Sequence, residues 1–225
     1  MIKSFNSLCK TMEQPIIDID IDNKQFMDVM ANVYALYIEH GTRSNKNVNY
    51  FHNYVKGELD NVFTLPDYSV VLEYDVPSTN SSRKKRCDIV VLKNDKPYII
   101  FPVKIIKTNY KQNKNNAWES LTGELQHIRW VNENITIIPI NILMNKTPYI
   151  DKSGKISKFE NITTEDIEIY KMLNTKRITF DMINYILVVE HSNSINEPFD
   201  KTPRILDFDT NTPFRSFYDI TRGLV

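Results

Sequence analysis

Cysteines and long apolar runs are scarce in this 225-residue sequence, and each scarcity excludes a class of protein. The two cysteines, Cys9 and Cys87, lie far apart without a C-x-x-C pair, which excludes a disulfide framework and a zinc finger. No run approaches the ~20 apolar residues of a membrane-spanning helix, and the N-terminus lacks the apolar core of a signal peptide. We therefore expect a cytoplasmic protein with no membrane partner.

An excess of charge of either sign is also missing. With 28 basic and 28 acidic residues the net charge is zero, so overall charge does not indicate nucleic acid, although it can conceal a basic face. The chain contains no P-loop, G-x-S-x-G or H-E-x-x-H motif, and its four histidines show no metal-binding spacing. Length and composition fit a single domain of residues 1–225. Frequent Asn, Lys and Ile indicate an AT-rich genome, so we expect a bacterial cytoplasm, or the host cell of a phage or virus.

Two helices are predicted in the N-terminal part, residues 22–62. Apolar residues recur at helical spacing as far as Gly41, and again over Lys46–Val62. His52 and Glu58 lie beside the second apolar stripe. Each helix is therefore expected to bury one face.

Alternation of apolar and polar residues then predicts a strand over Tyr68–Val76. The residues expected on its buried face are Val70, Leu72, Tyr74 and Val76. Glu73 and Asp75 share the other face, as exposed residues or as ligands of a cation.

A β-hairpin follows, because two runs of β-branched and aromatic residues flank Asn94-Asp95, which tolerate the left-handed backbone of a tight turn. The expected pairing sets Asp88 beside Pro102, and Lys104 points the same way as position 102. A carboxylate at the end of a strand can hold Mg²⁺, and a lysine beside it can stabilise charge on a phosphate or orient water.

Asp88, the hairpin and Pro102-Val103-Lys104 together resemble the PD-(D/E)XK nuclease superfamily, over roughly residues 58–143. The resemblance implies an α/β fold with a restriction-endonuclease-like core, in which α-helices flank a mixed central β-sheet. It also implies that Asp88 binds Mg²⁺ and that Lys104 acts on the attacking water. Two positions depart from the family: Cys87 replaces its proline, and Pro102 replaces its second acidic ligand.

Some members of the superfamily take that second acid from the following helix, here predicted over residues 115–131 by apolar spacing. Glu119 and Glu124 are the candidates in it, and Glu119 is preferred from its distance after the lysine. The resemblance also makes Glu58, on the helix before the first strand, a candidate ligand.

Two basic segments are the candidate DNA contacts, because cations suit phosphates and amides can hydrogen-bond adenine edges. The first is a segment leading to Asp88: Arg83, Lys84, Lys85 and Arg86. The second is predicted as a loop after Lys104: Lys107, Asn109, Tyr110, Lys111, Gln112, Asn113 and Lys114.

The rest of the catalytic core, residues 68–143, is completed by a strand over Ile135–Leu143, which makes a parallel crossover with the strand of Lys104. In the C-terminal part, residues 160–225, a helix is predicted from Thr163 to Asn174 and another over Asp181–His191. The proline-containing tail is expected to wrap the surface or reach a partner subunit.

These features favour a Mg²⁺-dependent, sequence-specific endonuclease that cuts double-stranded DNA, of the type II restriction kind found in restriction-modification systems. A palindromic target would call for a homodimer. Two alternatives remain open: a repair or RNA-processing nuclease with the same core, and an inactive relative that only binds nucleic acid because Pro102 replaces the acid.

Overall fold

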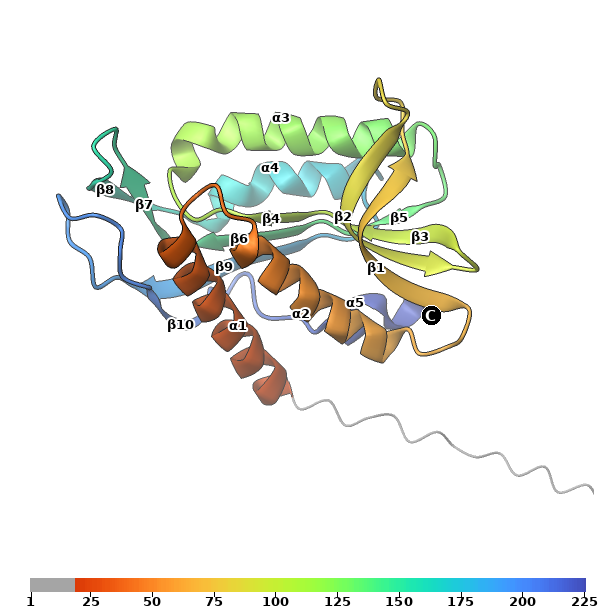
Figure 1. The fold of residues 1–225 in the computed structure, drawn as a ribbon, viewed down its shortest axis with the longest axis horizontal. Coiled ribbons are helices and arrows are strands. Elements are labelled where there is room, and N and C mark those ends of the chain that lie inside the picture. The colour runs from red at the N-terminus through yellow and green to blue at the C-terminus, as the bar shows by residue number, and fades with distance from the viewer. Residues whose placement is uncertain (1–18) are drawn as a thin grey trace, which may run out of the picture.

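The computed structural model describes residues 19–225, which form an α/β fold with mixed sheets and five α-helices. The helices are α1 (Ile19–His40), α2 (Lys46–Val62), α3 (Tyr110–Arg129), α4 (Thr164–Thr175) and α5 (Phe217–Thr221). Figure 1 shows α3 and α4 on one face of the strands and α1 and α2 on the other. The buried side chains accordingly form two clusters, one on each face.

The strands form two four-stranded sheets and one two-stranded sheet. They are β1 (Tyr68–Pro77), β2 (Lys84–Lys93), β3 (Lys96–Phe101), β4 (Val103–Ile105), β5 (Thr136–Ile137), β6 (Ile140–Met144), β7 (Lys146–Ile150), β8 (Ile156–Asn161), β9 (Ile183–Glu190) and β10 (Arg204–Phe208). One sheet has the order β1-β2-β3-β5 and another β10-β9-β6-β4, and β7 pairs with β8. Because β4 continues β3 and β6 continues β5, the two larger sheets run into each other.

Two prolines mark the junction between these sheets. Pro102 separates β3 from β4, and Pro139 separates β5 from β6, since neither residue has an N–H to donate to a ladder. Parallel pairing continues across the gap, because the Ile140 N–H donates to the Pro102 carbonyl at 2.8 Å. The strand predicted over Ile135–Leu143 is thus two short strands, β5 and β6.

Both N-terminal helices are confirmed. α2 has the predicted bounds, whereas α1 begins at Ile19, three residues before the predicted start of this region at residue 22. α1 ends where Gly41 takes a positive φ of 76° and donates its N–H to the Tyr37 carbonyl.

The predicted hairpin is also confirmed, with Asn94 and Asp95 both at positive φ between β2 and β3. The predicted faces of β1 are wrong in one respect. Val70 and Leu72 contact one core cluster, while Tyr74 and Val76 contact the other. The change occurs at Glu73, whose φ of 52° breaks the regular alternation although pairing with β2 resumes in the same register.

Three further predictions are corrected. The segment predicted as a loop after Lys104 is helical from Tyr110 onward, where α3 begins. Residues of the predicted helix over Asp181–His191 instead form β9, which lies between β6 and β10 and is buried on both faces. The tail is part of the fold, since β10 pairs with β9 and α5 contacts α2. The capping box of Thr163 and Asp166 is present at the start of α4, as predicted.

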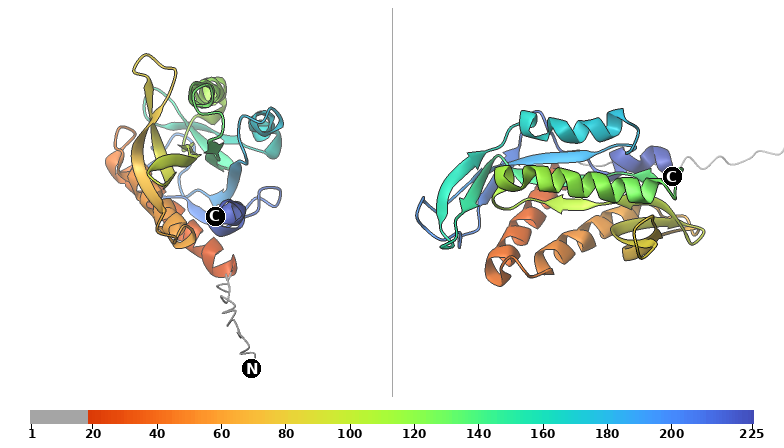
Figure 2. Two further views of the ribbon diagram at one scale, coloured as in Figure 1. Left: turned by 90° about the vertical axis from the view of Figure 1, so that its right-hand side faces the viewer. Right: turned by 90° about the horizontal axis from the view of Figure 1, so that it is seen from above.

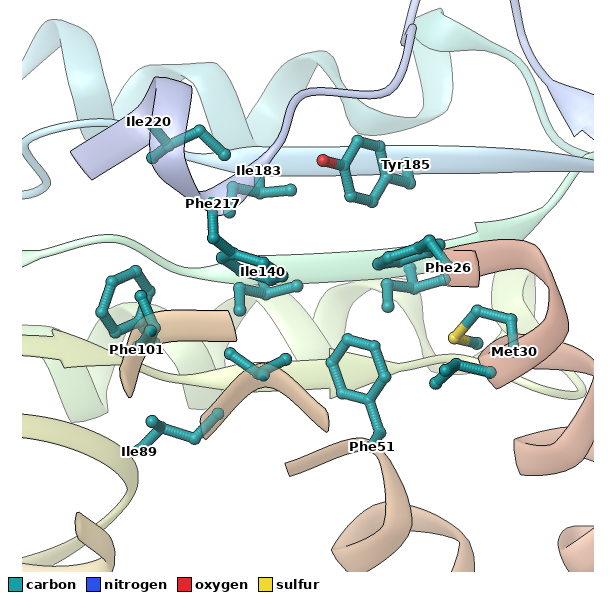
Figure 3. Close-up of a cluster of buried hydrophobic side chains, with 14 of the residues drawn as sticks. Phe26, Met30, Phe51, Ile89, Phe101, Ile140, Ile183, Tyr185, Phe217 and Ile220 are labelled. Atoms are coloured by element: carbon teal, nitrogen blue, oxygen red, sulfur yellow. The ribbon is translucent and has the colours of Figure 1, made fainter. Parts of the chain in front are cut away.

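An aromatic group anchors α1 and α2 to the sheet. Phe26 is fully buried, and its ring lies 5.1 Å from that of Tyr185 and 5.9 Å from that of Phe51. Figure 3 shows these three side chains converging from α1, β9 and α2. This contact holds α2, and His52 on it, against the strands.

Phe26→Ala is therefore expected to lower the free energy of unfolding by about 3–5 kcal/mol, because truncation leaves a cavity that neighbouring side chains cannot fill. Urea unfolding followed by circular dichroism measures the change. Tyr50→Ala, at an exposed position of α2, is the control and should cost less than about 1 kcal/mol. Equal losses in the two variants would contradict this role for Phe26.

Candidate metal centre and catalytic site

Asp88 is held in place by the proline interruption. It lies on β2 opposite the gap between β3 and β4, and its Oδ2 accepts a 2.7 Å hydrogen bond from the Val103 N–H. Pro102 thus ends β3 where the following N–H can turn to Asp88. The side chain is partly buried and fixed, with its other oxygen available to a ligand.

His52 and Glu73 lie beside Asp88. One ligand atom from each of these three residues lies within 4.8 Å of the others. His52 comes from α2 and is 2% exposed, whereas Glu73 is exposed at the irregular position of β1. The distance from His52 Nδ1 to Glu73 Oε1 is 3.9 Å. These side chains could hold a metal ion.

The state of His52 suits a metal ligand. Burial lowers the pKa of its imidazole, against the opposing effects of Asp88 and Glu73, so the neutral ring is favoured near pH 7. A neutral imidazole offers one lone pair, and the ring nitrogen 3.9 Å from Glu73 is Nδ1, which leaves the proton to Nε2. Two carboxylates and an imidazole are a plausible divalent-metal set; the carboxylates suit Mg²⁺ or Mn²⁺, and the nitrogen favours transition metals.

Lys104 and Glu124 lie on the other side of Asp88. All three line one hollow of about 190 Å³, with Ser120 and Lys85 among its other lining residues. Glu124 Oε2 lies 3.2 Å from Lys85 Nζ. Burial raises the pKa of Glu124 and nearby Asp88 adds to this, while Lys85 opposes it. The hollow therefore combines two carboxylates with three cations, Lys85, Arg86 and Lys104, around a small space.

Of the three glutamates predicted as metal ligands, one lines the hollow of Asp88 and two do not. Glu124 reaches the hollow of Asp88, on the helix face that also carries Ser120. Glu119 is exposed and does not line that hollow. Glu58, on α2, does not belong to the three-residue cluster, and burial and then Asp22 raise its pKa. The structure thus brings Glu124, and not the preferred Glu119, to Asp88.

For the nuclease reaction that the PD-(D/E)XK resemblance implies, Glu124→Gln is expected to slow cleavage about 10–100-fold, because it removes a charge that orients Lys85 and the groups beside Asp88. Glu119→Gln is the matched control on the same helix and should retain activity within about twofold. Initial rates on a labelled duplex measure both. A larger loss of rate in Glu119→Gln than in Glu124→Gln would instead assign this role to Glu119.

The first basic segment is not a flexible loop throughout, because Lys84, Lys85 and Arg86 belong to β2. Lys85 faces Glu124, whereas Arg86 pairs with Asp75 at 3.2 Å on the neighbouring strand. Arg83 and Lys84 are exposed at the start of β2. Arg83 and Lys84 are therefore the two residues of this basic segment whose side chains remain available to DNA phosphates on that surface.

The second basic segment is mostly structural. Asn109 bonds to both the N–H and the carbonyl of Ile150 through its side chain, at 2.8 and 2.9 Å. Tyr110 is fully buried and donates to the Asp166 carbonyl, so neither residue is placed to contact DNA as predicted. Lys114 pairs with Asp166, while Lys111, Gln112 and Asn113 are exposed on the first turns of α3.

Sequence reasoning did not identify His52 as a ligand, and it favoured an exposed, structural reading of Glu73. His52 is one histidine beside an apolar stripe, without a partner at metal-binding spacing. Glu73 was considered as a cation ligand only together with Asp75 on the same strand, but the structure places it beside His52 and Asp88 instead. The signal that could have found it is its position on β1 between Leu72 and Tyr74, whose partners Ile89 and Cys87 flank Asp88 on β2.

Comparison with protein-family models, curated proteins and solved structures finds no match to this chain. Across residues 19–225, none of the helices combines the length and the apolar character needed to cross a membrane.

Proposed function

We propose that this protein is a metal-dependent endonuclease that hydrolyses phosphodiester bonds in double-stranded DNA, with Asp88 at its centre. The observation that supports the proposal is the position of Asp88 between the cluster with His52 and Glu73 and the hollow with Lys104. Metal ligands on one side and a cation on the other are the parts that phosphodiester hydrolysis requires. The resemblance to the PD-(D/E)XK superfamily supports the same assignment for Asp88 and Lys104.

His52, Glu73 and Asp88 would hold the metal. A divalent ion bound there supplies a Lewis acid for the phosphoryl group and lowers the pKa of a bound water. Asp88 is fixed by the Val103 N–H, and burial keeps His52 neutral, so the ligands need little rearrangement. Mg²⁺ is the proposed physiological ion, and Mn²⁺ should replace it because the set contains a nitrogen.

Lys104 acts on the substrate side of Asp88. It is exposed on β4 and lines the hollow, where its ammonium can stabilise the negative charge that develops on the phosphate oxygens or orient the attacking water. Glu124 positions Lys85 beside it and so keeps a second cation facing the hollow. Arg83 and Lys84 can contact flanking phosphates.

The experiment is incubation of the purified protein with a mixed set of plasmids in Mg²⁺, in Mn²⁺ and in EDTA, resolved on a gel. Discrete fragments that require the metal are expected for a sequence-specific enzyme, and two-fold symmetric sites would indicate a homodimer. Metal-dependent smearing would indicate the repair or processing nuclease. Intact plasmid under every condition would overturn the proposed function.

A further inference from the structure

A second, larger cavity adjoins the hollow of Asp88. Its volume is about 380 Å³, within the ~300–1,000 Å³ typical of small-molecule sites. The two spaces share Lys104, Ala117 and Ser120 on their walls. Anything bound in the cavity therefore lies next to the proposed reaction site.

Three parts of the chain build this cavity. Tyr37 comes from the end of α1, Lys107 and Thr108 from the segment after β4, and Asn116 from α3. Figures 1 and 2 place the α1–α2 connection and the beginning of α3 at the same end of the molecule. The cavity thus extends from the site toward that end, along α3.

The charge in the cavity is positive. Lys104 and Lys107 line it, and no aspartate or glutamate among residues 19–225 does. Lys107 is partly buried, its Nζ lies 5.3 Å from the centre of the Tyr37 ring, and it donates to the Ile105 carbonyl at 3.5 Å. Among the described residues neither lysine forms an ion pair with a carboxylate.

A partly buried lysine without a neighbouring anion makes an unfavourable contribution to the free energy of the folded protein. Burial lowers the pKa of Lys107 to about 8, and Lys104 contributes to this. Lys107 nevertheless remains mostly protonated at pH 7, so the free protein holds two cations facing one space. A bound anion would remove this unfavourable arrangement, because it supplies the missing counter-charge.

The other walls suit a nucleotide rather than a simple ion. Thr42, Thr108, Asn116 and Ser120 present hydroxyl and amide groups, which can hydrogen-bond to phosphate and sugar oxygens. Tyr37 adds an aromatic ring at the wall, beside Lys107, where a base can make apolar contact. The cavity is also larger than one phosphate needs.

We propose that this cavity is a subsite for one nucleotide residue adjacent to the scissile phosphate, with the phosphate on Lys107 and the base toward Tyr37. The assignment of the neighbouring phosphate as scissile rests on the proposed function. Binding of the nucleotide itself does not require cleavage.

The test is calorimetric titration of thymidine 5′-monophosphate into the full-length protein in EDTA, where no cleavage occurs. Saturable binding is expected, and Lys107→Met should weaken it at least tenfold. Lys152→Met is the matched control, because Lys152 is an exposed lysine between β7 and β8 that lies outside the cavity, and it should change binding less than twofold. Thymidine, which lacks the phosphate, should bind at least tenfold more weakly than the monophosphate.

Absence of saturable monophosphate binding to the wild-type protein, or equal binding by Lys107→Met, would overturn the subsite. Each result is independent of nuclease activity. Binding that depends on Lys107 in a protein that cuts no plasmid would keep the subsite and reject the proposed reaction. Metal-dependent cleavage by the wild-type protein, together with unchanged monophosphate binding in Lys107→Met, would reject the subsite and keep the proposed reaction.

Discussion

Asp88→Asn is expected to reduce cleavage of double-stranded DNA by about 1,000-fold or more, because the variant loses the carboxylate shared by the proposed metal ligands and the hollow. A bound metal contributes several kcal/mol to transition-state stabilisation, and every 1.36 kcal/mol is a factor of ten in rate. The fold should survive, since an asparagine oxygen can still accept the hydrogen bond that Val103 donates to Asp88. Single-turnover rates on a labelled duplex measure the loss.

Asp75→Asn is the control for this variant. Asp75 lies on β1, next to the same hairpin, but pairs with Arg86 and is not part of the three-residue cluster. Its cleavage rate should stay within about threefold of the wild-type value. A comparable loss of cleavage rate in both variants would mean that any acidic residue near the hairpin supports activity, and that Asp88 has no specific role.

Lys104→Met is expected to lower kcat about 100–1,000-fold with KM changed only a few-fold. The reason is that Lys104 acts on charge that develops in the transition state, and removing one such donor typically costs this much. Steady-state kinetics on an oligonucleotide duplex separate kcat from KM.

Lys96→Met provides the comparison, because Lys96 is an exposed lysine at the start of β3 in the same hairpin. Its kinetics should match those of the wild-type protein. If Lys104→Met raised KM and left kcat intact, Lys104 would be a binding residue and the proposed reaction would need another group.

The hairpin that carries Asp88 could be predicted because its signals are local. Asn94 and Asp95 specify the turn and so the pairing of β2 with β3, although the register shifts by one residue between Val91 and Leu92. α2 was likewise predictable from its apolar spacing and from Gly41 before it.

β9 could not be distinguished from a helix because its sequence is almost continuously apolar. A strand that is buried on both faces loses the alternation that identifies strands. Its identity comes from neighbours distant in sequence, since Ile140 to Met144 on β6 pair with it in parallel. The early start of α3 has a similar origin, because Asn109 is fixed by Ile150 across 41 residues.

The site itself was only half predictable. Asp88 and Lys104 follow from the hairpin, but His52 reaches them through the packing of α2, to which Phe26 and Phe51 contribute. The choice between the two glutamates of α3 depends on which face of the helix meets the sheet. Glu124 shares that face with Ser120 and Leu121, and the predicted helix alone did not fix this.

The most direct test of the proposed metal centre is Mn²⁺ binding measured by electron paramagnetic resonance of the free ion. The wild-type protein and Asp75→Asn should bind Mn²⁺ saturably with similar affinity, and Asp88→Asn should bind at least about tenfold more weakly because it loses a charged ligand. Equal binding by Asp88→Asn and the wild-type protein would contradict a metal centre at His52, Glu73 and Asp88.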